Sequence, residues 1–360
     1  MSRQRVWSVG MLAAAVLLLG ALACTSAPAA PSKPAAVSAA ASGAAASGSA
    51  ATGPAAPAPA SAQPVPEIRR LMVGVSALSA TALVQLVGMD YGIYARHGFE
   101  VEIQQGRPAV TMAALVGGEL DYASGVDSVI RGVAAARLPL KVIAVSKRAP
   151  TFGMIVRPEI GSVQELRGKV ISVTAATGAN MSALNGMLRA NGVSPQEVET
   201  LIGSDAPVQL QHLLQGLCDA AALSAPGIFE AQDRGYRMLV YAPDVVSFPQ
   251  TGLVASDERI ATRRDEARRM IVANTEIVEF IKANKEQAVE SLVRRFGISR
   301  ELAAKTYDFE VPAYTADPRL DLREVALIIQ EEVEAGLAAP IAPEMVVAVD
   351  LTEEAVRQAR

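Results

Sequence analysis

The composition of the stretch from Thr25 to Pro66 is the strongest constraint on which part of this chain can form a folded domain. It consists almost entirely of Ala, Pro, Ser, Gly and Thr, with Lys33 as its only charged side chain. Such a composition buries too little apolar surface to offset the conformational entropy lost on folding, and its eight prolines disfavour an Ala-rich helix. We therefore expect a disordered, partly extended tether over residues 24–66 and a folded region that begins near Glu67.

The residues before this stretch have the pattern of an export signal. Two arginines precede an apolar run from Val9 to Ala23, which suits the core of a signal peptide better than a membrane span of about 20 residues. The run ends in Ala-Leu-Ala before Cys24, which resembles a bacterial lipobox with Ala21 in the place where Leu is usual. Residues 1–23 would then be a signal peptide and Cys24 would carry the lipid. The alternative is an ordinary signal peptide cleaved near Ala23, with Cys24 incidental.

Charge and cysteine content exclude several classes of protein. The formal net charge is −4, so the sequence has no electrostatic footprint for nucleic acid. After Cys24 only Cys218 remains, which excludes an internal disulfide and a Cys-rich metal site. The two histidines, His97 and His212, do not make a conventional zinc site. We expect no metal, no cofactor and no catalytic residues.

Beyond Glu67, short β-rich runs alternate with helical stretches. In a first unit the predicted strands are 71–75, 99–103, a short one near 122 and 141–145, and the predicted helices are 81–95, 109–116 and 129–136. In a second unit the predicted strands are 170–173, 198–202, 220–223 and 237–241, with a helix at 179–190. Alternation of this kind predicts α/β architecture, with a mixed, mostly parallel sheet covered by helices in each of two lobes.

The pattern becomes helical after Ser256. Residues 264–282 place their apolar side chains on one face, as an amphipathic helix does. Ser299 is expected to cap a later helix, and Asp321 with Glu324 resembles a capping box.

Two segments, 151–157 and 250–256, are predicted to cross between the units as strands. Two such crossings would make a hinge with a cleft beside it. We expect lobe 1 to comprise residues 67–152 and 256–345, and lobe 2 to comprise residues 153–255. Residues 346–360 are expected to form a C-terminal tail or helix.

Four stretches resemble the type II periplasmic binding proteins that serve nitrate, sulfonate, taurine and thiamine-pyrimidine-precursor importers. They are Asp90–Glu102, Leu115–Ala123, Ser162–Val173 and Leu213–Ala221. The resemblance implies a two-lobed fold that captures a small solute and delivers it to an ABC permease driven by a cytoplasmic ATPase. We also expect an extracytoplasmic monomer, held at the membrane by the lipid on Cys24, that is not an enzyme.

Ligands of open α/β sheets bind at the carboxyl ends of strands, where loops lead into helices. This rule selects the candidate ligand-binding residues Ser76, Leu78, Gly106, Arg107, Ser124, Asp127, Thr174, Thr177, Gly178, Asn180 and Ser224.

The loop from Thr174 to Asn180 is the strongest of these candidates. N–H groups at a helix start, together with hydroxyls, favour an anionic or acceptor-rich ligand group. Thr177 or Asn180 could instead cap its own helix, and Ser76 and Ser124 present the same two alternatives.

The two charged candidates also have alternative roles. Arg107 could neutralise a ligand anion or lie on the surface. Asp127 could accept a hydrogen bond from a ligand amine or cap the following helix. The favoured ligand is a small polar, anionic or heterocyclic metabolite such as a sulfonate, nitrate or a pyrimidine. The functional alternatives to import are a ligand-sensing domain for a membrane receptor and a biosynthetic enzyme on the same fold.

Overall fold

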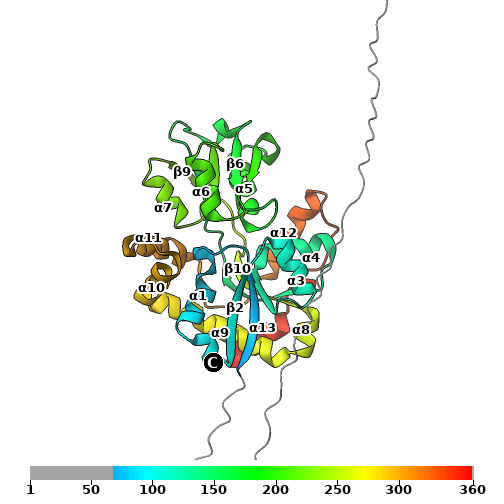
Figure 1. Cartoon of the computed structure of the whole chain (residues 1–360). Helices are drawn as coiled ribbons and strands as arrows, with labels where there is room; N and C mark the ends of the chain where they lie inside the picture. Colours follow the sequence, from blue (N-terminus) through cyan, green and yellow to red (C-terminus); the bar gives the residue numbers. More distant parts are fainter. Residues whose placement is uncertain (1–67, 359–360) are drawn as a thin grey trace, which may run out of the picture. The chain divides into compact units, whose positions relative to one another are not determined.

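The computed structural model describes residues 68–358. The predicted signal peptide, Cys24 and the tether lie outside the described residues. The described residues fold into two α/β lobes, each built on a five-stranded sheet (Figure 1). The predicted fold class is confirmed. Within residues 68–358, no helix is both long and apolar enough to cross a membrane.

The sheet of lobe 1 has the strand order β2-β1-β3-β10-β4. Its strands are β1 (Arg69–Val75), β2 (Phe99–Gln105), β3 (Tyr122–Gly125), β4 (Leu140–Lys147) and β10 (Thr251–Ser256). β1 pairs in parallel with β2 and β3, whereas β10 runs antiparallel between β3 and β4. A strand from much later in the chain thus completes the sheet that the first strands begin.

The sheet of lobe 2 repeats this plan with the order β7-β6-β8-β5-β9. Its strands are β5 (Gly153–Val156), β6 (Val170–Val173), β7 (Glu199–Ile202), β8 (Ala220–Leu223) and β9 (Arg237–Tyr241). β6 pairs in parallel with β7 and β8, and β5 is the one reversed strand, between β8 and β9.

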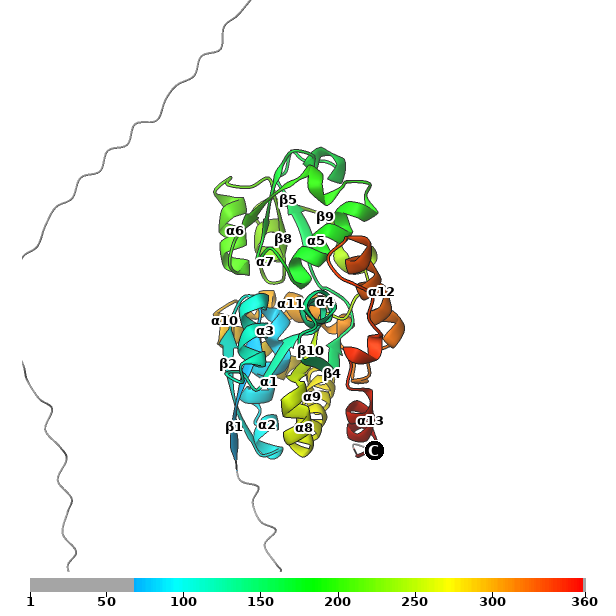
Figure 2. The same cartoon turned by 90° about the vertical axis from the view of Figure 1, so that its right-hand side faces the viewer.

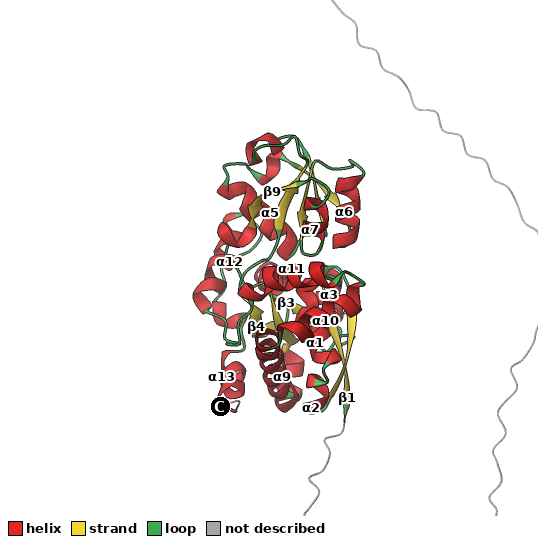
Figure 3. Ribbon diagram, turned by 90° about the vertical axis from the view of Figure 1, so that its left-hand side faces the viewer, coloured by secondary structure: helices red, strands yellow, loops and turns green. Residues whose placement is uncertain are grey.

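Helices cover both sheets, and most of them belong to lobe 1 (Figures 1 and 3). Those of lobe 1 are α1 (Leu83–Asp90), α2 (Ile93–Arg96), α3 (Pro108–Val116), α4 (Val126–Ala136), α8 (Asp257–Thr262), α9 (Arg264–Ala283), α10 (Lys285–Phe296), α11 (Arg300–Glu310), α12 (Leu322–Glu334) and α13 (Val349–Gln358). Lobe 2 has α5 (Ala179–Ala190), α6 (Ala206–Leu214) and α7 (Gly227–Gln232). Short 3-10 turns are η1 (Ala80–Ala82), η2 (Val163–Leu166), η3 (Pro195–Glu197), η4 (Ala242–Asp244), η5 (Val311–Ala313) and η6 (Pro343–Met345).

The amphipathic pattern of α9 is confirmed by its burial. Its predicted apolar face is at most 1% exposed and consists of Ala267, Met270, Ile271, Ile277, Val278 and Ile281. This face packs into the core of lobe 1 and anchors the C-terminal helices. Figure 2 shows α12 beside α4, at the level where the two lobes meet.

The helix caps predicted from the sequence are confirmed only in part. Ser299 accepts a hydrogen bond from the N–H of Leu302, as expected. Asp321 caps α12, but it accepts from the N–H of Arg323. The expected capping box is wrong because the carboxylate of Glu324 turns toward Arg148, 3.7 Å away.

The single helix expected over residues 81–95 is two helices. α1 ends at Asp90, and α2 begins at Ile93. Gly92 lies between them with φ at +63°, a left-handed conformation that interrupts the helix.

The predicted crossings are displaced toward the N-terminus. Residues 153–156 form β5 and residues 251–256 form β10, and each strand is paired on both sides within its own sheet. The chain instead crosses at residues 148–152 and, after η4, returns at residues 245–250. The expected end of lobe 2 at residue 255 is therefore wrong, because β10 belongs to lobe 1. Within residues 346–358, Val347 bridges to Val142 of β4 and α13 follows, so this segment also packs on lobe 1.

A buried ion pair fixes the point where the chain leaves lobe 1. Lys147 ends β4, Glu310 ends α11, and their side chains form an ion pair at 0% exposure. Thr151, in the outgoing crossing, donates a hydrogen bond to the Glu310 carboxylate at 2.8 Å. The N–H of Gln250, in the returning crossing, donates to the carbonyl of Lys147 at 2.8 Å. Burial lowers the pKa of Lys147, and the Glu310 carboxylate opposes that shift.

Glu310→Gln should destabilise the whole molecule, because it leaves a buried ammonium without its counter-charge. We expect a loss of about 3–5 kcal/mol in the free energy of unfolding, measured by urea denaturation. Glu301→Gln on the same helix is the matched control, since Glu301 is 79% exposed and pairs with Lys305 at the surface. The control should leave the urea midpoint unchanged. Equal midpoints for both variants would contradict this account.

Candidate ligand-binding site

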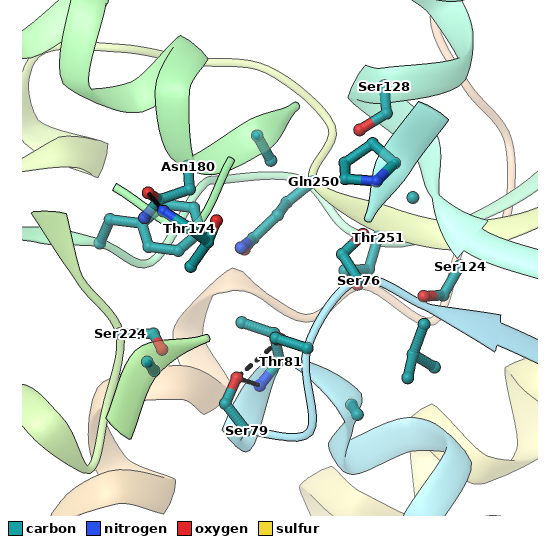
Figure 4. Close-up of a pocket in the computed structure, with 18 of the residues that line it drawn as sticks. Ser76, Ser79, Thr81, Ser124, Ser128, Thr174, Asn180, Ser224, Gln250 and Thr251 are labelled. Atoms are coloured by element: carbon teal, nitrogen blue, oxygen red, sulfur yellow. Dashed lines mark hydrogen bonds between the residues drawn. The ribbon is translucent and has the colours of Figure 1, made fainter. Parts of the chain in front are cut away.

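A cavity of about 60 Å³ lies between the two lobes, where the strands of both sheets end (Figure 4). Its polar lining consists of Ser76, Ser79, Thr81, Ser124, Ser128, Thr174, Thr177, Asn180, Gln209, Ser224, Gln250 and Thr251. Its apolar lining consists of Val75, Ala77, Ala82, Pro108, Gly125, Phe152, Ala179 and Ala206. The cavity occupies the position that the strand-end rule predicts for a ligand.

Several helices begin at the wall of this cavity. The first residues of α3, α5 and α6 line it, and so does Gly125, the residue before α4. α3, α4 and α5 have no side-chain cap. In α4 the N–H of Val126 donates to the carbonyl of Gln250 at 3.2 Å, and the other N–H groups of these first turns are left for a ligand. Converging helix starts create a positive potential that attracts acceptor atoms or a negative charge.

No side chain with a formal charge lines the cavity among the described residues. Binding there depends on hydroxyls, amides and backbone N–H groups. Within residues 68–358, no cluster of three or more His, Cys, Asp or Glu side chains could hold a metal ion. The site can therefore recognise a small neutral or singly anionic molecule by hydrogen bonds.

Six of the predicted site residues line the cavity. They are Ser76, Ser124, Thr174, Thr177, Asn180 and Ser224. Asn180 also shapes the loop before α5, because it accepts from the Thr174 N–H at 3.0 Å and donates to the carbonyl of Ala222 at 2.7 Å. Asn180 thus ties its helix start to the ends of β6 and β8.

Five predicted residues lie outside the lining. The Leu78 side chain is 46% exposed and Arg107 is also exposed, at the start of α3. Gly106 continues the backbone pairing beyond β2, with its N–H donated to the Val75 carbonyl. The other two, Asp127 and Gly178, lie where the lobes touch each other.

Gly178 allows the lobes to approach closely. Its φ is +94°, and a Cβ there would lie 2.8 Å from Cγ of Pro108 and 3.0 Å from Oγ of Ser128, both in lobe 1. Any side chain at this position would push the lobes apart. Gly178 therefore acts in lobe contact and not by touching the cavity.

Asp127 joins the lobes by hydrogen bonds. It is fully buried and accepts from Ser182 Oγ of lobe 2 and from Arg131 Nε of lobe 1, each at 2.9 Å. Arg131 also donates to Glu332 and Glu331 of α12, at 2.6 and 2.9 Å. Burial raises the pKa of Asp127, an effect that Arg131 and Ser182 oppose. We call Asp127, Ser182 and Arg131 the interlobe latch.

The opposite flank of the lobes is joined by aromatic rings. Phe309 of α11 packs against Phe229 and Tyr241 of lobe 2, with ring centroids 5.5 and 4.7 Å apart. The two lobes are thus in contact on both sides of the crossings.

A larger groove of about 610 Å³ lies outside the cavity and shares Ser128 and Thr177 with it. Met112, Met181 and Phe248 give this groove an apolar part. The groove therefore adjoins the cavity at these two shared residues.

Sequence reasoning missed several lining residues. The missed polar residues are Ser79, Thr81, Ser128, Gln209, Gln250 and Thr251. Ser79, Thr81 and Ser128 lie one to five residues beyond predicted positions, so a wider window at each strand end would have included them. Gln250 and Thr251 stand at the start of a predicted crossing, which was a usable signal. Gln209 lies within α6, and nothing local in the sequence indicates its role.

A family model described as NMT1/THI5 like matches residues 82–288, more than half of the chain. The chain belongs to the NMT1/THI5-like family. The match runs from η1 into α10 and includes the whole of lobe 2. The predicted resemblance to type II periplasmic binding proteins is confirmed for the family and for the fold, although no curated protein sequence matches the chain.

Solved structures share the fold of this NMT1/THI5-like chain at low sequence identity. The periplasmic aliphatic sulphonate binding protein SsuA from Escherichia coli is 16% identical over 77% of this chain and 91% of that chain, with a TM-score of 0.63. The periplasmic nitrate-binding protein NrtA from Synechocystis PCC 6803 is 14% identical over 82% and 90%, with a TM-score of 0.68. The desulfurization enzyme DSZB is 16% identical over 81% and 99%, with a TM-score of 0.58. The fold therefore carries both binding proteins and an enzyme, and the cavity itself must distinguish them.

Ser182→Ala should shift the lobes toward an open arrangement, because it removes the only lobe 2 donor to Asp127 in the latch. A hydrogen bond to a buried charge stabilises by enough to change the closed-to-open ratio roughly tenfold. Spin labels on the exposed positions Glu119→Cys of lobe 1 and Glu199→Cys of lobe 2 would report the interlobe distance distribution.

The matched control for the latch is Ser162→Ala. Ser162 Oγ donates to Glu165 at 2.9 Å, the same kind of bond at the same length, but within lobe 2. The control should leave the distance distribution as it is in the wild type. An unchanged distribution in Ser182→Ala would show that the latch does not hold the lobes together.

Proposed function

We propose that this chain is the extracytoplasmic solute-binding lipoprotein of an ABC importer. The observation that carries the proposal is the cavity between two lobes, lined by strand ends and helix starts and free of charged side chains. Such a site can hold a small molecule by hydrogen bonds and release it when the lobes separate. SsuA is a sulphonate-binding and NrtA a nitrate-binding protein, and both support this role.

Among the described residues, the two histidines and Cys218, which could supply acid–base or thiol chemistry, do not line the cavity. Ser172 and His212 hydrogen-bond at 3.0 Å, but neither lines the cavity, and Ser172 is fully buried in β6. Cys218 is 1% exposed, and burial raises the pKa of its thiol to about 11, which disfavours a nucleophilic thiolate. These placements favour binding over the enzymatic alternative that DSZB represents.

The proposal extends to the partners. Lipidation of Cys24 and the Ala/Pro/Ser-rich tether would keep the folded lobes near a membrane while allowing them to reach a permease. The permease, with its cytoplasmic ATPase, would accept the solute from the two lobes. We propose that the protein works as a monomer, since both lobes must be free to dock.

Thermal unfolding against a panel of small sulfonates, nitrate and pyrimidines tests the proposal. A bound compound should stabilise the protein by about 2.7 kcal/mol at a hundredfold excess over its dissociation constant. Mass spectrometry should recover that compound unchanged. Recovery of an altered compound would contradict the binding role and favour an enzyme.

Thr174→Val tests whether the ligand binds in the cavity, because it removes a lining hydroxyl while keeping the size of the side chain. We expect this variant to lose most of the ligand-induced stabilisation. Thr200→Val is the matched control, since Thr200 is exposed on β7 and outside the lining. Equal ligand shifts in the two variants would show that the ligand binds elsewhere.

A further inference from the structure

Two glutamines in the cavity wall are each held at one end of the amide. Gln250, in the returning crossing, is 3% exposed, and its Oε1 accepts from the N–H of Thr151 at 3.2 Å. That bond fixes the orientation of the amide. The Nε2 group of Gln250 is then left for the cavity, toward which the side chain points in Figure 4.

Gln209 is held at the opposite end. It is fully buried, and its Nε2 donates to the carbonyls of Ser172 and Ala222 at 3.0 and 3.1 Å. Reversing this amide would bring Oε1 against two carbonyl oxygens, so the orientation is determined. Oε1 of Gln209 has no hydrogen-bond partner among the described residues, although Gln209 lines the cavity.

The opposite wall of the cavity also has an unpartnered group. Oγ1 of Thr251, in β10 of lobe 1, is buried and has no partner within residues 68–358. A hydroxyl can donate or accept, so Thr251 adapts to a ligand, whereas Gln209 Oε1 can only accept. Gln209 Oε1 is therefore the buried acceptor in this wall that a donor on a ligand would satisfy.

A buried acceptor without a partner is costly, and the cost is removed only by a donor. An oxyanion that has acceptors alone would set its lone pairs against Gln209 Oε1. The helix starts and the Gln250 amide, in contrast, supply donors to an acceptor. No carboxylate lines the cavity to balance a cationic donor. The complementary donor is therefore a neutral N–H or O–H.

We infer that Gln209 and Gln250 select a small ligand, neutral or singly anionic, that carries both hydrogen-bond acceptors and at least one N–H or O–H donor. This inference rests on the proposed function and narrows its ligand class. It disfavours nitrate and unsubstituted alkanesulfonates as the cognate solute. The 60 Å³ cavity has room for roughly four to six non-hydrogen atoms of the recognised group.

Four tetrahedral sulfonyl compounds of nearly equal size test the inference on the wild-type protein. Sulfamate and methanesulfonate are monoanions that differ by an amino group in place of a methyl group. Methanesulfonamide and dimethyl sulfone are the corresponding neutral pair. Calorimetric titration should show the amino member of each pair binding about tenfold more tightly than the methyl member, because only it satisfies Gln209.

Gln209→Met assigns the preference to one residue, since methionine keeps the length of the side chain and removes its amide. In this variant the amino and methyl members should bind equally. Gln85→Met is the matched control, because Gln85 is 2% exposed and also has an unpartnered Oε1, but it lies on α1 outside the lining. The control should retain the tenfold preference. If Gln209→Met fails to fold, the probe pairs on the wild type still decide the question.

Two results would overturn the inference. Equal or tighter binding of the methyl members would show that a water molecule satisfies Gln209, while the proposed capture of a solute would stand. Binding of none of the four compounds would show that the cavity does not recognise a group of this shape and polarity. The proposed function fails on a different result, the recovery of a chemically altered compound.

Discussion

The arrangement of the two lobes depends on the buried ion pair between Lys147 and Glu310. It lies where β4 ends and the chain leaves lobe 1. Both crossings bond to its two residues: the Thr151 hydroxyl donates to the Glu310 carboxylate, and the Gln250 N–H donates to the Lys147 carbonyl. A buried ion pair is weak evidence for stability, because desolvation offsets much of the attraction. A buried ion pair does, however, require its two side chains to keep a defined position. Here that position of Lys147 also fixes Gln250, which bonds to it, at the wall of the cavity.

The cavity is made by contacts between elements that are far apart in the chain. Lobe 1 supplies the loops after β1 and β3, and lobe 2 supplies the starts of α5 and α6. Gly178 allows the lobes to touch, and the latch through Asp127 and the rings around Phe309 hold the two flanks. The latch and the aromatic rings lie outside the cavity lining, whereas Pro108 and Ser128 both line the cavity and face Gly178 across the lobe contact.

The strand-end rule predicted the loop from Thr174 to Asn180 because this signal is local: a β run, hydroxyl residues and a helix start. The same rule selected Asp127, whose burial against Ser182 depends on the contact between lobes and is not encoded nearby in the sequence. Gln209 was missed for the same reason, since it reaches the cavity from within a helix. Leu78 and Arg107 were selected by position, but the direction of a side chain in a loop has no comparable sequence signal.

The place of β10 in the sheet of lobe 1 has a consequence for the order of folding. Every strand of lobe 2 lies between β4 and β10 in the chain, so lobe 2 is a continuous segment that can fold as soon as it emerges. Lobe 1 lacks a central strand until residue 256 has been made, and the edges of β3 and β4 remain unpaired until then. A chain that crosses a membrane before folding would be exposed to mispairing at those edges, and early folding of lobe 2 shortens the distance that β10 must span to reach them.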